Sequence, residues 1–507
     1  MKKLNNAVAE EFGEPCADDL PVKVLQFGTG NFLRGFMDWM IDEMNRQGRF
    51  NGRIRIVQSV SRNAVNLLAA QDNRYTLILR GIENGQATVV KTIVGAVAGG
   101  LSAKSQFDQV LREAENPDLR IIISNTTEAG IVLHTEDTPS DMPPSSFPGK
   151  LLRLMRHRYE TCDGDTARGF LIFPCELIDH NGDTLKEILM TLAGRWYPGD
   201  NSFRSWLNDA NIYFNTLVDR IVSGYPEEEA DKICRELGYT DSMIDTGELF
   251  HFLAIEGPKK YEEEFPLISA GFNVKWCGDI SPYKTRKVRI LNGAHTMTVL
   301  AAHLQGLTTV RECMENPTVS AYLRRGIFEE IIPTLDLPQE ELTEFGEAVL
   351  ERFSNPFLRH LLLSISLNSV SKWKTRVMPS LLEYRSRFGK LPESLTFSLA
   401  ALILFYRGRE RCETSLKGTR EVDGAIYDIQ DSPEVLDWFY ALWQEQAEIS
   451  EAGCTALTRK VLAKKDFWGK DLREVQGLTE ATGRFLNEML SKGVEPVIGR
   501  LAEKSDE

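Results

Sequence analysis

Three residues whose types suit carbonyl chemistry stand close together in the sequence: Lys287, Asn292 and His295. A ketone that accepts a hydride develops negative charge on its oxygen, which must be polarised and then protonated. A desolvated lysine can give up that proton near neutral pH and take it back in the reverse direction. An asparagine amide can donate a hydrogen bond to the same oxygen, and a histidine can orient the lysine or the substrate. The three residues therefore suit reversible reduction of a carbonyl group.

The spacing of these residues is compatible with a single helix. At about 100° per residue, Asn292 and His295 lie about 60° apart and share a face. Lys287 lies about one and a half turns before Asn292, so it must reach back along the helix or approach from its entrance. Each residue also has a structural alternative: a solvated surface lysine, an Asn-Gly turn and a hydrogen-bonded core histidine. The residues taken alone leave these alternatives open.

A glycine-rich turn that could hold a cofactor lies between a strand-like run and a helical one, with the sequence Phe27-Gly28-Thr29-Gly30-Asn31-Phe32. Glycine lets the backbone turn sharply and approach a pyrophosphate, whose charge the amino terminus of a helix favours. The turn departs from the GxGxxG pattern, because Leu33 stands at the third glycine position. Its place in the first strand–helix unit nevertheless favours a dinucleotide site, and a plain strand–helix turn is the alternative. The expected cofactor contacts are Phe27, Gly28, Gly30, Asn31 and Phe32.

Two further segments bear on the cofactor. The second strand-like run ends in the sequence QSVSR, without the usual acidic residue for a ribose, and Arg62 could meet a 2′-phosphate. These residues leave NAD and NADP open. Polar residues also follow the buried run LRIIIS, and the carboxyl ends of such strands face the ligand crevice. We expect Asn125, Thr126 and Glu128 to contact the cofactor, with a hydrogen-bonded turn as the alternative.

The elements that must position these residues follow an α/β pattern in the first part of the chain. The strand-like runs are residues 22–27, 54–60, 75–79, 89–97, 119–124 and 169–173, and the helical ones include 32–45 and 107–115. From about residue 270 long helical patterns dominate, and the apolar run at 397–406 is expected to form a buried helix. The pattern predicts an α/β domain with a mainly parallel sheet over residues 1–270 and a mostly α-helical domain over residues 271–507.

Composition limits the possible partners. With 507 residues, 42% of them hydrophobic and 26% charged, the chain is typical of a globular protein of two domains. A formal net charge of −14 argues against nucleic-acid and anionic-membrane partners. The amino terminus lacks the apolar core of a signal peptide, and no apolar run is long enough for a bilayer, so we expect a cytoplasmic protein. The eight cysteines form no CxxC pair and no HExxH pattern occurs, so we expect no metal. The oligomeric state is not indicated.

Several motifs in register resemble the long-chain mannitol dehydrogenase family over nearly the whole chain. They are the spacing K-x4-N-x2-H from Lys287 to His295, and the segments FGTGNFLRGF, SNTTEAG, PCELIDHNG, LVDRI, RFSNP and Ser371-Lys372. The resemblance implies a Rossmann-type domain followed by a helical domain. It also implies a dehydrogenase that depends on NAD or NADP and needs no metal.

The resemblance also implies a role for each matching residue. Lys287 would be the general acid and base, and Asn181 and Asn292 would hold the reacting oxygen. His295 would position Lys287 or a substrate hydroxyl. Asp219 would line the substrate pocket.

Four segments resemble those family members that reduce the ketone of a sugar acid with NAD: PCELIDHNGDTL, TLVDRIVSGYP, KTRKVRILNGAHT and LTFSLAALILFYRG. Polyol-oxidising members carry Cys-Asp-Asn where this chain has Cys175-Glu176-Leu177, which disfavours a mannitol-type substrate. The resemblance therefore implies NAD as cofactor and a small sugar acid as partner. Another reductase or a polyol dehydrogenase of the same family is the nearest alternative, and a catalytically inactive sugar-acid or nucleotide sensor is a more distant one.

A sugar acid carries a carboxylate, which favours arginine or lysine as its ligand. The candidates are Lys372, Lys374 and Arg376, with Lys372 first because it matches a family position. A solvated basic face is the alternative for Lys374 and Arg376. A local group of cations would also explain how a protein of net negative charge binds an anion.

Overall fold

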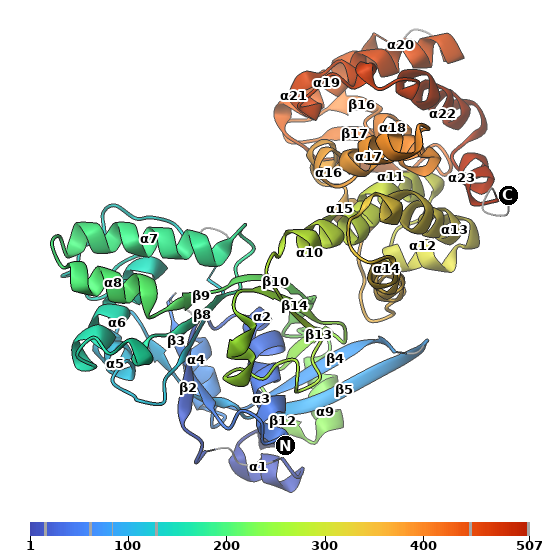
Figure 1. Cartoon of the computed structure of the whole chain (residues 1–507). Helices are drawn as coiled ribbons and strands as arrows, with labels where there is room; N and C mark the ends of the chain where they lie inside the picture. Colours follow the sequence, from blue (N-terminus) through green and yellow to red (C-terminus); the bar gives the residue numbers. More distant parts are fainter. Residues whose placement is uncertain (15–17, 60–62, 84, 127–129, 446–448, 504–507) are drawn as a thin grey trace. The chain divides into compact units, whose positions relative to one another are not determined.

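The structure, a computed structural model, describes residues 1–14, 18–59, 63–83, 85–126, 130–445 and 449–503. The chain divides into two compact units. The first comprises Met1–Gly81 and Thr88–Ile280, and the second comprises Ile82–Ala87 and Ser281–Glu507. The first unit is mostly blue to green in Figure 1, and the second is mostly yellow to red.

The core of the first unit is a six-stranded parallel sheet. Its strands lie in the order β6 (Val97–Ser102), β3 (Arg53–Gln58), β2 (Val22–Phe27), β7 (Ile121–Ser124), β8 (Leu171–Pro174) and β9 (Ile212–Tyr213). All five neighbouring pairs are parallel. Counted along the chain, the order is 3-2-1-4-5-6, which is that of doubly wound dinucleotide-binding sheets. The α/β expectation is confirmed.

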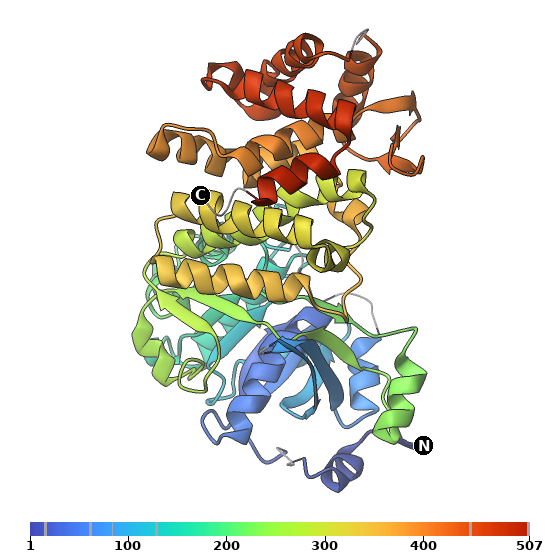
Figure 2. The same cartoon turned by 90° about the vertical axis from the view of Figure 1, so that its right-hand side faces the viewer.

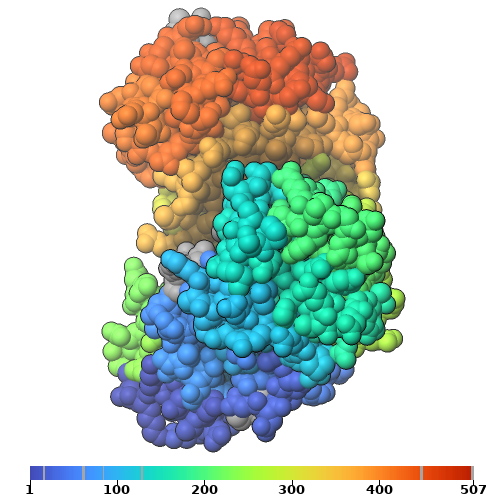
Figure 3. Space-filling model, turned by 90° about the vertical axis from the view of Figure 1, so that its left-hand side faces the viewer, coloured from blue at the N-terminus to red at the C-terminus, as the bar shows by residue number. Residues whose placement is uncertain are grey.

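Alternating side chains of the strands enter two separate cores, because successive residues of a strand point to opposite faces. Val24 and Ile121 belong to the core beneath η1 (Arg34–Asp38) and α3 (Trp39–Arg46). Leu25 and Ile122 belong to the core on the other face. Four helices cover that other face: α5 (Phe107–Glu113), α6 (Phe147–Thr161), α7 (Asn181–Trp196) and α8 (Asn201–Asp209). Figure 3 shows part of their outer surface in teal and green.

Two smaller sheets complete the first unit. One has the order β10 (Asn215–Asp219), β14 (Phe252–Glu256) and β15 (Val274–Cys277). The other has the order β11 (Val222–Gly224), β13 (Asp245–Glu248), β4 (Tyr75–Glu83) and β5 (Gln86–Val94). The remaining elements are α1 (Asn6–Glu11), α2 (Asn31–Leu33), α4 (Ala64–Ala69), α9 (Ala230–Leu237) and the pair β1 (Lys2–Lys3) and β12 (Tyr239–Thr240).

The single strand expected at 89–97 is wrong. The run contains the end of β5 and the start of β6, which belong to different sheets. The chain changes sheet at Gly95, where an added Cβ would lie 2.4 Å from the Arg74 guanidinium and where the amide donates to Asp42. An apolar run cannot reveal this change, because the residues on both sides of Gly95 are buried.

The second unit is mostly helical, as expected. It begins with α10 (Ser281–Arg286), η4 (Lys287–Asn292) and α11 (Gly293–Gln305). The apolar α18 (Glu393–Phe405) lies between α11 and α22 (Leu478–Lys492) (Figures 1 and 2), and it is buried from Ser394 onward. The buried helix expected at 397–406 is therefore confirmed. No helix among the described residues is long and apolar enough to cross a membrane.

The other elements of the second unit surround this centre. They are α12 (Val310–Glu315), α13 (Pro317–Arg325), η5 (Gly326–Ile331), α14 (Gln339–Phe353), α15 (Leu362–Ile365), α16 (Ser369–Arg376), α17 (Met378–Phe388), α19 (Pro433–Gln444), α20 (Glu451–Leu462), α21 (Lys465–Trp468), α23 (Glu495–Glu503) and the antiparallel strands β16 (Gly408–Arg411), β17 (Leu416–Thr419) and β18 (Ile426–Ile429).

Candidate active site

Lys287 and Asn292 begin and end a π-helical turn rather than an α-helical one. The chain is α-helical through Arg286, π-helical over Lys287–Asn292 and α-helical again from Gly293. In an α-helix, residues five apart lie about 140° apart around the axis. In a π-helix the hydrogen bonds run between residues five apart, so such residues lie on adjacent turns near the same face. The expected α-helical separation of Lys287 from Asn292 is therefore wrong, and the wider turn brings Lys287 toward the face of Asn292.

Two arginines fix the rotation of this turn. Arg286 is 4% exposed, donates to Glu341 of α14 at 2.8 Å and packs its guanidinium 4.2 Å from the ring centre of Phe345. Arg289 donates to Ser380 of α17 at 2.9 Å. These contacts attach the turn to α14 just before Lys287 and to α17 just after it.

The side chain of Asn292 is half-buried, and its amide makes no hydrogen bond with any residue that the structure describes. Its backbone carbonyl accepts from Thr296 at 2.9 Å, as in an ordinary helix. Gly293 follows, and a Cβ there would lie 3.1 Å from the backbone oxygen of Arg376. Glycine at 293 therefore allows the end of α16 to approach the helix that carries Asn292.

The ring of His295 is held by other rings. It stacks on Phe353 with centroids 4.1 Å apart and planes 13° apart, and it meets His360 edge-on at 5.2 Å. Its Nε2 is buried and has no hydrogen-bond partner among the described residues. Burial lowers the pKa of His295 well below its ordinary value of 6.5, and His360 and the nearby cations lower it further. His295 is therefore a neutral imidazole at physiological pH.

The cations that act on His295 are Arg352, Arg376 and Lys372. Two of the three candidate carboxylate ligands, Lys372 and Arg376, thus act electrostatically on His295. Burial lowers the pKa of Lys372, and the charge of Arg376 lowers it further, whereas Asp431 acts in the opposite direction. Lys374 points elsewhere, since a Cβ on Gly469 beside α21 would lie 3.3 Å from its Cε.

Asn181, the second asparagine expected to hold the reacting oxygen, is fully hydrogen-bonded within the first unit. Its Nδ2 donates to the carbonyl of Pro174 at 2.9 Å, and its Oδ1 accepts from the amide of Thr216 at 2.9 Å. Further contacts of Nδ2 reach the carbonyls of Glu176 and Thr216. These bonds join the end of β8 to β10, so the side chain positions strand ends. Asp219 is buried at the end of β10.

The glycine-rich turn has the form that a dinucleotide site requires. Gly28 has a φ of 133°, and a Cβ there would lie 2.8 Å from the carbonyl oxygen of Asn125. Gly30 has no such constraint, because a Cβ there would meet nothing within 4 Å. Gly30 and Asn31 are exposed at the start of α2, while Phe27 is buried and Phe32 stacks on Phe36. The open space at Gly30 fits the close approach of a ligand that the chain itself does not supply.

Glu176 binds the segment after β7, which is the second segment expected to contact the cofactor. It accepts hydrogen bonds from Ser124 and from both the amide and the hydroxyl of Thr126, each at 3.0 Å. Asn125 donates to the carbonyl of Cys175 at 2.6 Å. Glu176 is a functional residue that no pattern in the sequence marked, because its partners Ser124 and Thr126 lie about 50 residues earlier in the chain. Glu128 and Arg62 lie outside the described residues.

A buried charge cluster beneath the turn escaped the sequence analysis. Arg34 donates to Oδ1 of Asn31 at 2.6 Å and to the carbonyl of Met243 at 2.8 Å. Its guanidinium lies 3.8 Å from Asp245. Burial raises the pKa of Asp38 and that of Asp245, each to about 7. No sequence motif marks this cluster, because its members come from separate segments of the chain.

Among the residues that the structure describes, one group brings together three potential metal ligands: His180, Asp183 and Glu256, with ligand atoms within 4.8 Å of one another. The two carboxylates already accept hydrogen bonds from Asn215, at 2.8 and 2.9 Å. Glu256 accepts a further one from the amide of Ile280. Metal independence stays a prediction.

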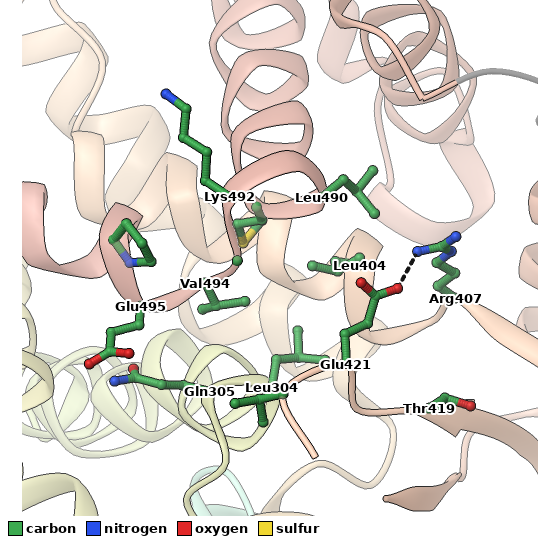
Figure 4. Close-up of a pocket in the computed structure, with 14 residues that line it drawn as sticks. Leu304, Gln305, Leu404, Arg407, Thr419, Glu421, Leu490, Lys492, Val494 and Glu495 are labelled. Atoms are coloured by element: carbon green, nitrogen blue, oxygen red, sulfur yellow. Dashed lines mark hydrogen bonds and ion pairs between the residues drawn. The ribbon is translucent and has the colours of Figure 1, made fainter. Parts of the chain in front are cut away.

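A pocket of about 320 Å³ lies in the second unit, where α11, α18 and the junction of α22 with α23 meet. Figure 4 shows its apolar side chains and the ion pair of Arg407 with Glu421, 2.8 Å long. Its lining residues are Leu304, Gln305, Leu404, Arg407, Thr419, Glu421, Val422, Met489, Leu490, Lys492, Gly493, Val494, Glu495 and Pro496. None of the expected site residues is among them.

A doubly wound sheet with a glycine-rich turn after its first strand, together with a helical unit that carries a lysine, an asparagine and a histidine, defines the class of two-domain dehydrogenases. The model of the mannitol dehydrogenase Rossmann domain matches residues 22–269, and that of the mannitol dehydrogenase C-terminal domain matches residues 279–490. The chain belongs to the mannitol dehydrogenase family.

Relatives and solved structures agree with this assignment. An altronate oxidoreductase from Enterobacter sp. (strain 638) is 43% identical over 483 residues, which cover 95% of this chain and 97% of the relative. One from Pectobacterium carotovorum is 43% identical, with coverage of 94% and 96%. Pseudomonas fluorescens mannitol 2-dehydrogenase, solved with NAD and D-mannitol, is 20% identical with a TM-score of 0.66, and covers 99% of this chain and 100% of its own. A substrate-free D-sorbitol dehydrogenase is 22% identical with a TM-score of 0.75, and covers 95% and 96%. The two solved structures share the fold.

Proposed function

We propose that the protein is an oxidoreductase that reduces the ketone of D-tagaturonate to D-altronate with NADH. The observation that carries the proposal is that three cations, Arg352, Lys372 and Arg376, act on His295. His295 lies in α11, directly after the turn that holds Lys287 and Asn292. A polyol offers no charge for such a group, whereas a sugar acid does. The altronate oxidoreductase name of relatives at 43% identity supports the same substrate.

NADH, which the first unit would bind, would supply the hydride for the ketone carbon. Residues of this chain hold it there: the backbone at Gly28 and Gly30 approaches the pyrophosphate, and Asn31 and Phe32 line the helix start. Asn125 and Thr126, which follow β7, are proposed to contact the cofactor, and a contact of Glu128 stays a prediction from the sequence. Residues 1–270 form the cofactor domain and residues 271–507 the substrate domain.

The chain's own groups manage the charge and the proton. Asn292 donates a hydrogen bond to the ketone oxygen while negative charge develops there. Lys287 gives a proton to the same oxygen and takes it back in the reverse reaction. His295, being neutral, orients Lys287 or a substrate hydroxyl without adding a charge. Asn181 is proposed as a second donor to the ketone oxygen, and Asp219 as a residue that lines the substrate pocket.

Lys372 and Arg376 are the proposed ligands of the substrate carboxylate. Lys372 and Arg376 belong to a group of like charges whose mutual repulsion an anion relieves. The group also explains how a chain with a net charge of −14 attracts an acid. We propose a cytoplasmic enzyme that acts on small molecules, without metal, membrane or nucleic acid.

The test is NADH oxidation, followed by absorbance, with D-tagaturonate, D-fructuronate and D-fructose in the presence of a chelator. We expect the highest kcat/KM with D-tagaturonate and no loss of rate on chelation. A preference for D-fructuronate would change the acid that is assigned, and a preference for D-fructose would overturn the assignment of an acidic substrate.

A further inference from the structure

The ends of three neighbouring strands, β2, β7 and β8, form the edge of the sheet at which the cofactor is expected. Along the chain, the sheet grows from β2 through β3 to β6 and then starts again at β7, on the other side of β2. In a doubly wound sheet the ligand lies outside the carboxyl ends of the strands where their order reverses in this way. The pyrophosphate is expected at the turn after β2 and the adenosine ribose at the end of β3, so the nicotinamide half extends toward β7 and β8.

The segment after β7 closes directly on the glycine-rich turn. The amide of Asn125 donates to the carbonyl of Phe27 at 3.1 Å. The carbonyl oxygen of Asn125 lies 2.8 Å from the position that a Cβ on Gly28 would take. Thr126 follows and is half-buried. A displacement of this segment would therefore change the space between the turn and the end of β7.

Glu176 is the side chain that binds this segment from the end of β8. It is 3% exposed, and its Oε1 accepts from both the amide and the hydroxyl of Thr126 at 3.0 Å. Its Oε2 accepts from the hydroxyl of Ser124, which is 1% exposed. Among the residues that the structure describes, no lysine or arginine pairs with this carboxylate. Its described partners elsewhere in the chain thus all belong to the segment that begins at Ser124.

These hydrogen bonds give the segment a single conformation. Asn125 and Thr126 lie in neither a helix nor a strand, so they have no ladder of backbone hydrogen bonds beyond the end of β7. A buried carboxylate is unfavourable unless donors satisfy it, and all three donors here come from two residues of one segment. Any movement of Thr126 would therefore leave the carboxylate without its donors.

We propose that Glu176 is a positioning residue for the nicotinamide half of the cofactor, and that it acts through Ser124 and Thr126. The inference rests on the proposed function, which requires NADH. Glu176 keeps the segment in the conformation in which Asn125 and Thr126 present polar groups to the cofactor. Its loss leaves the expected pyrophosphate and adenosine contacts at β2 and β3 in place.

The test measures the dissociation constants of NADH and of ADP-ribose, which lacks the nicotinamide, by calorimetry. Glu176→Met keeps the length of the side chain and removes both acceptors. Glu176→Gln keeps the length and one oxygen for Thr126, and its amide can donate to the hydroxyl of Ser124. Ser124→Ala removes one of the three donors and is the milder variant.

Glu330→Met, in the second unit, is the matched control. Glu330 is 2% exposed and accepts from the amides of Ser394 and Leu395 at 2.8 and 3.0 Å. This variant removes a buried carboxylate of the same kind from the unit that lacks the glycine-rich turn. Thermal unfolding of each variant distinguishes loss of the fold from loss of binding.

We expect Glu176→Met to raise the dissociation constant of NADH about tenfold and to leave that of ADP-ribose within about twofold of the wild type. Glu176→Gln should stay within about threefold for both ligands, and Ser124→Ala should raise the constant of NADH about threefold. Glu330→Met should lower the unfolding temperature without changing either constant.

An unchanged affinity for NADH in both Glu176→Met and Ser124→Ala would overturn the inference, and so would an equal loss of affinity for NADH and ADP-ribose. A Glu176→Gln variant that binds NADH as poorly as Glu176→Met would also overturn it, because the hydrogen bonds would then not be the cause. In each of these cases wild-type turnover of D-tagaturonate would still uphold the proposed function. A wild type that does not bind NADH would overturn both.

Discussion

At the scale of single residues, two asparagines that share an expected role have opposite surroundings. The amide of Asn292 has no partner among the described residues, whereas that of Asn181 bonds to Pro174 and Thr216. A side-chain amide without a protein partner can donate a hydrogen bond to the negatively charged substrate oxygen. An amide that already has hydrogen bonds within the protein must first break them. Removal of the Asn292 side chain should therefore reduce catalysis, whereas removal of the Asn181 side chain should reduce stability.

We predict that Asn292→Ala lowers kcat about 100- to 1,000-fold, the usual loss for one donor to a developing oxyanion, with little change in thermal stability. Asn181→Ala should instead lower the free energy of unfolding by about 1–3 kcal/mol, because it leaves buried backbone groups unsatisfied. Kinetics and chemical denaturation of both variants check this. Unchanged kcat in Asn292→Ala would remove that residue from the mechanism.

Gly30 lies in the glycine-rich turn next to open space. A Cβ there meets no atom of the chain, so Gly30→Ala should fold normally and yet raise KM for NADH about tenfold or more, since the methyl occupies the space of the cofactor. Gly194→Ala is the control: it also meets nothing within 4 Å, and it lies inside α7. That control should gain about 0.5–1 kcal/mol of stability with unchanged kinetics. An unaltered KM for NADH in Gly30→Ala would place the cofactor elsewhere.

At the scale of elements, the π-helical turn η4 brings Lys287 and Asn292 toward the same face of the helix. The sequence was compatible with a helix here but left an Asn-Gly turn open. It could not indicate the π turn, since one wider turn leaves the neighbouring apolar residues Ile290 and Leu291 buried as before. The sequence could not indicate the hydrogen bonds of Arg286 to Glu341 and of Arg289 to Ser380 either, because the partners are distant in sequence.

We predict that Gly293→Ala disturbs the site through α16. The added Cβ would lie 3.1 Å from the backbone oxygen of Arg376, so the end of α16 must shift. KM for D-tagaturonate should rise, and kcat/KM should fall about tenfold, while the helix itself tolerates alanine well. Kinetic constants identical to those of the wild type would show that the contact between Gly293 and Arg376 has no part in substrate binding.

At the scale of the whole molecule, local patterns predicted the α/β sheet, the buried helix at 397–406 and the change of texture near residue 270. They did not predict which segments meet. His360 and Arg352 act on His295 from distant positions in the sequence, and Asp245 meets Arg34 and Asp38 of η1 from a distant segment. Such clusters depend on the tertiary fold, which no local pattern encodes.

The buried charge cluster of Arg34, Asp38 and Asp245 makes the free energy of unfolding depend on pH. The pKa of Asp38 is about 7 in the folded protein, against 3.8 ordinarily, because burial disfavours its charge. Its contribution to stability is thus present below pH 4 and is lost as the pH rises through about 7. Arg34, Asp245, Gln26 and Tyr75 all act on this carboxyl.

We predict that Asp38→Asn, which cannot ionise, flattens the fall in the free energy of unfolding between about pH 4 and pH 7. Urea denaturation of both proteins across this range measures the slope. A variant whose slope equals that of the wild type would show that Asp38 does not titrate between those limits.

In the proposed mechanism, Lys287 transfers the proton in a ketone reduction. Its most direct test is the rate of NADH oxidation with D-tagaturonate for the wild type, Lys287→Ala and the control Lys284→Ala, all with a chelator present. We predict that Lys287→Ala loses several orders of magnitude in kcat while NADH binding persists, and that Lys284→Ala keeps most of its activity. A Lys287→Ala variant as active as the wild type would contradict the mechanism.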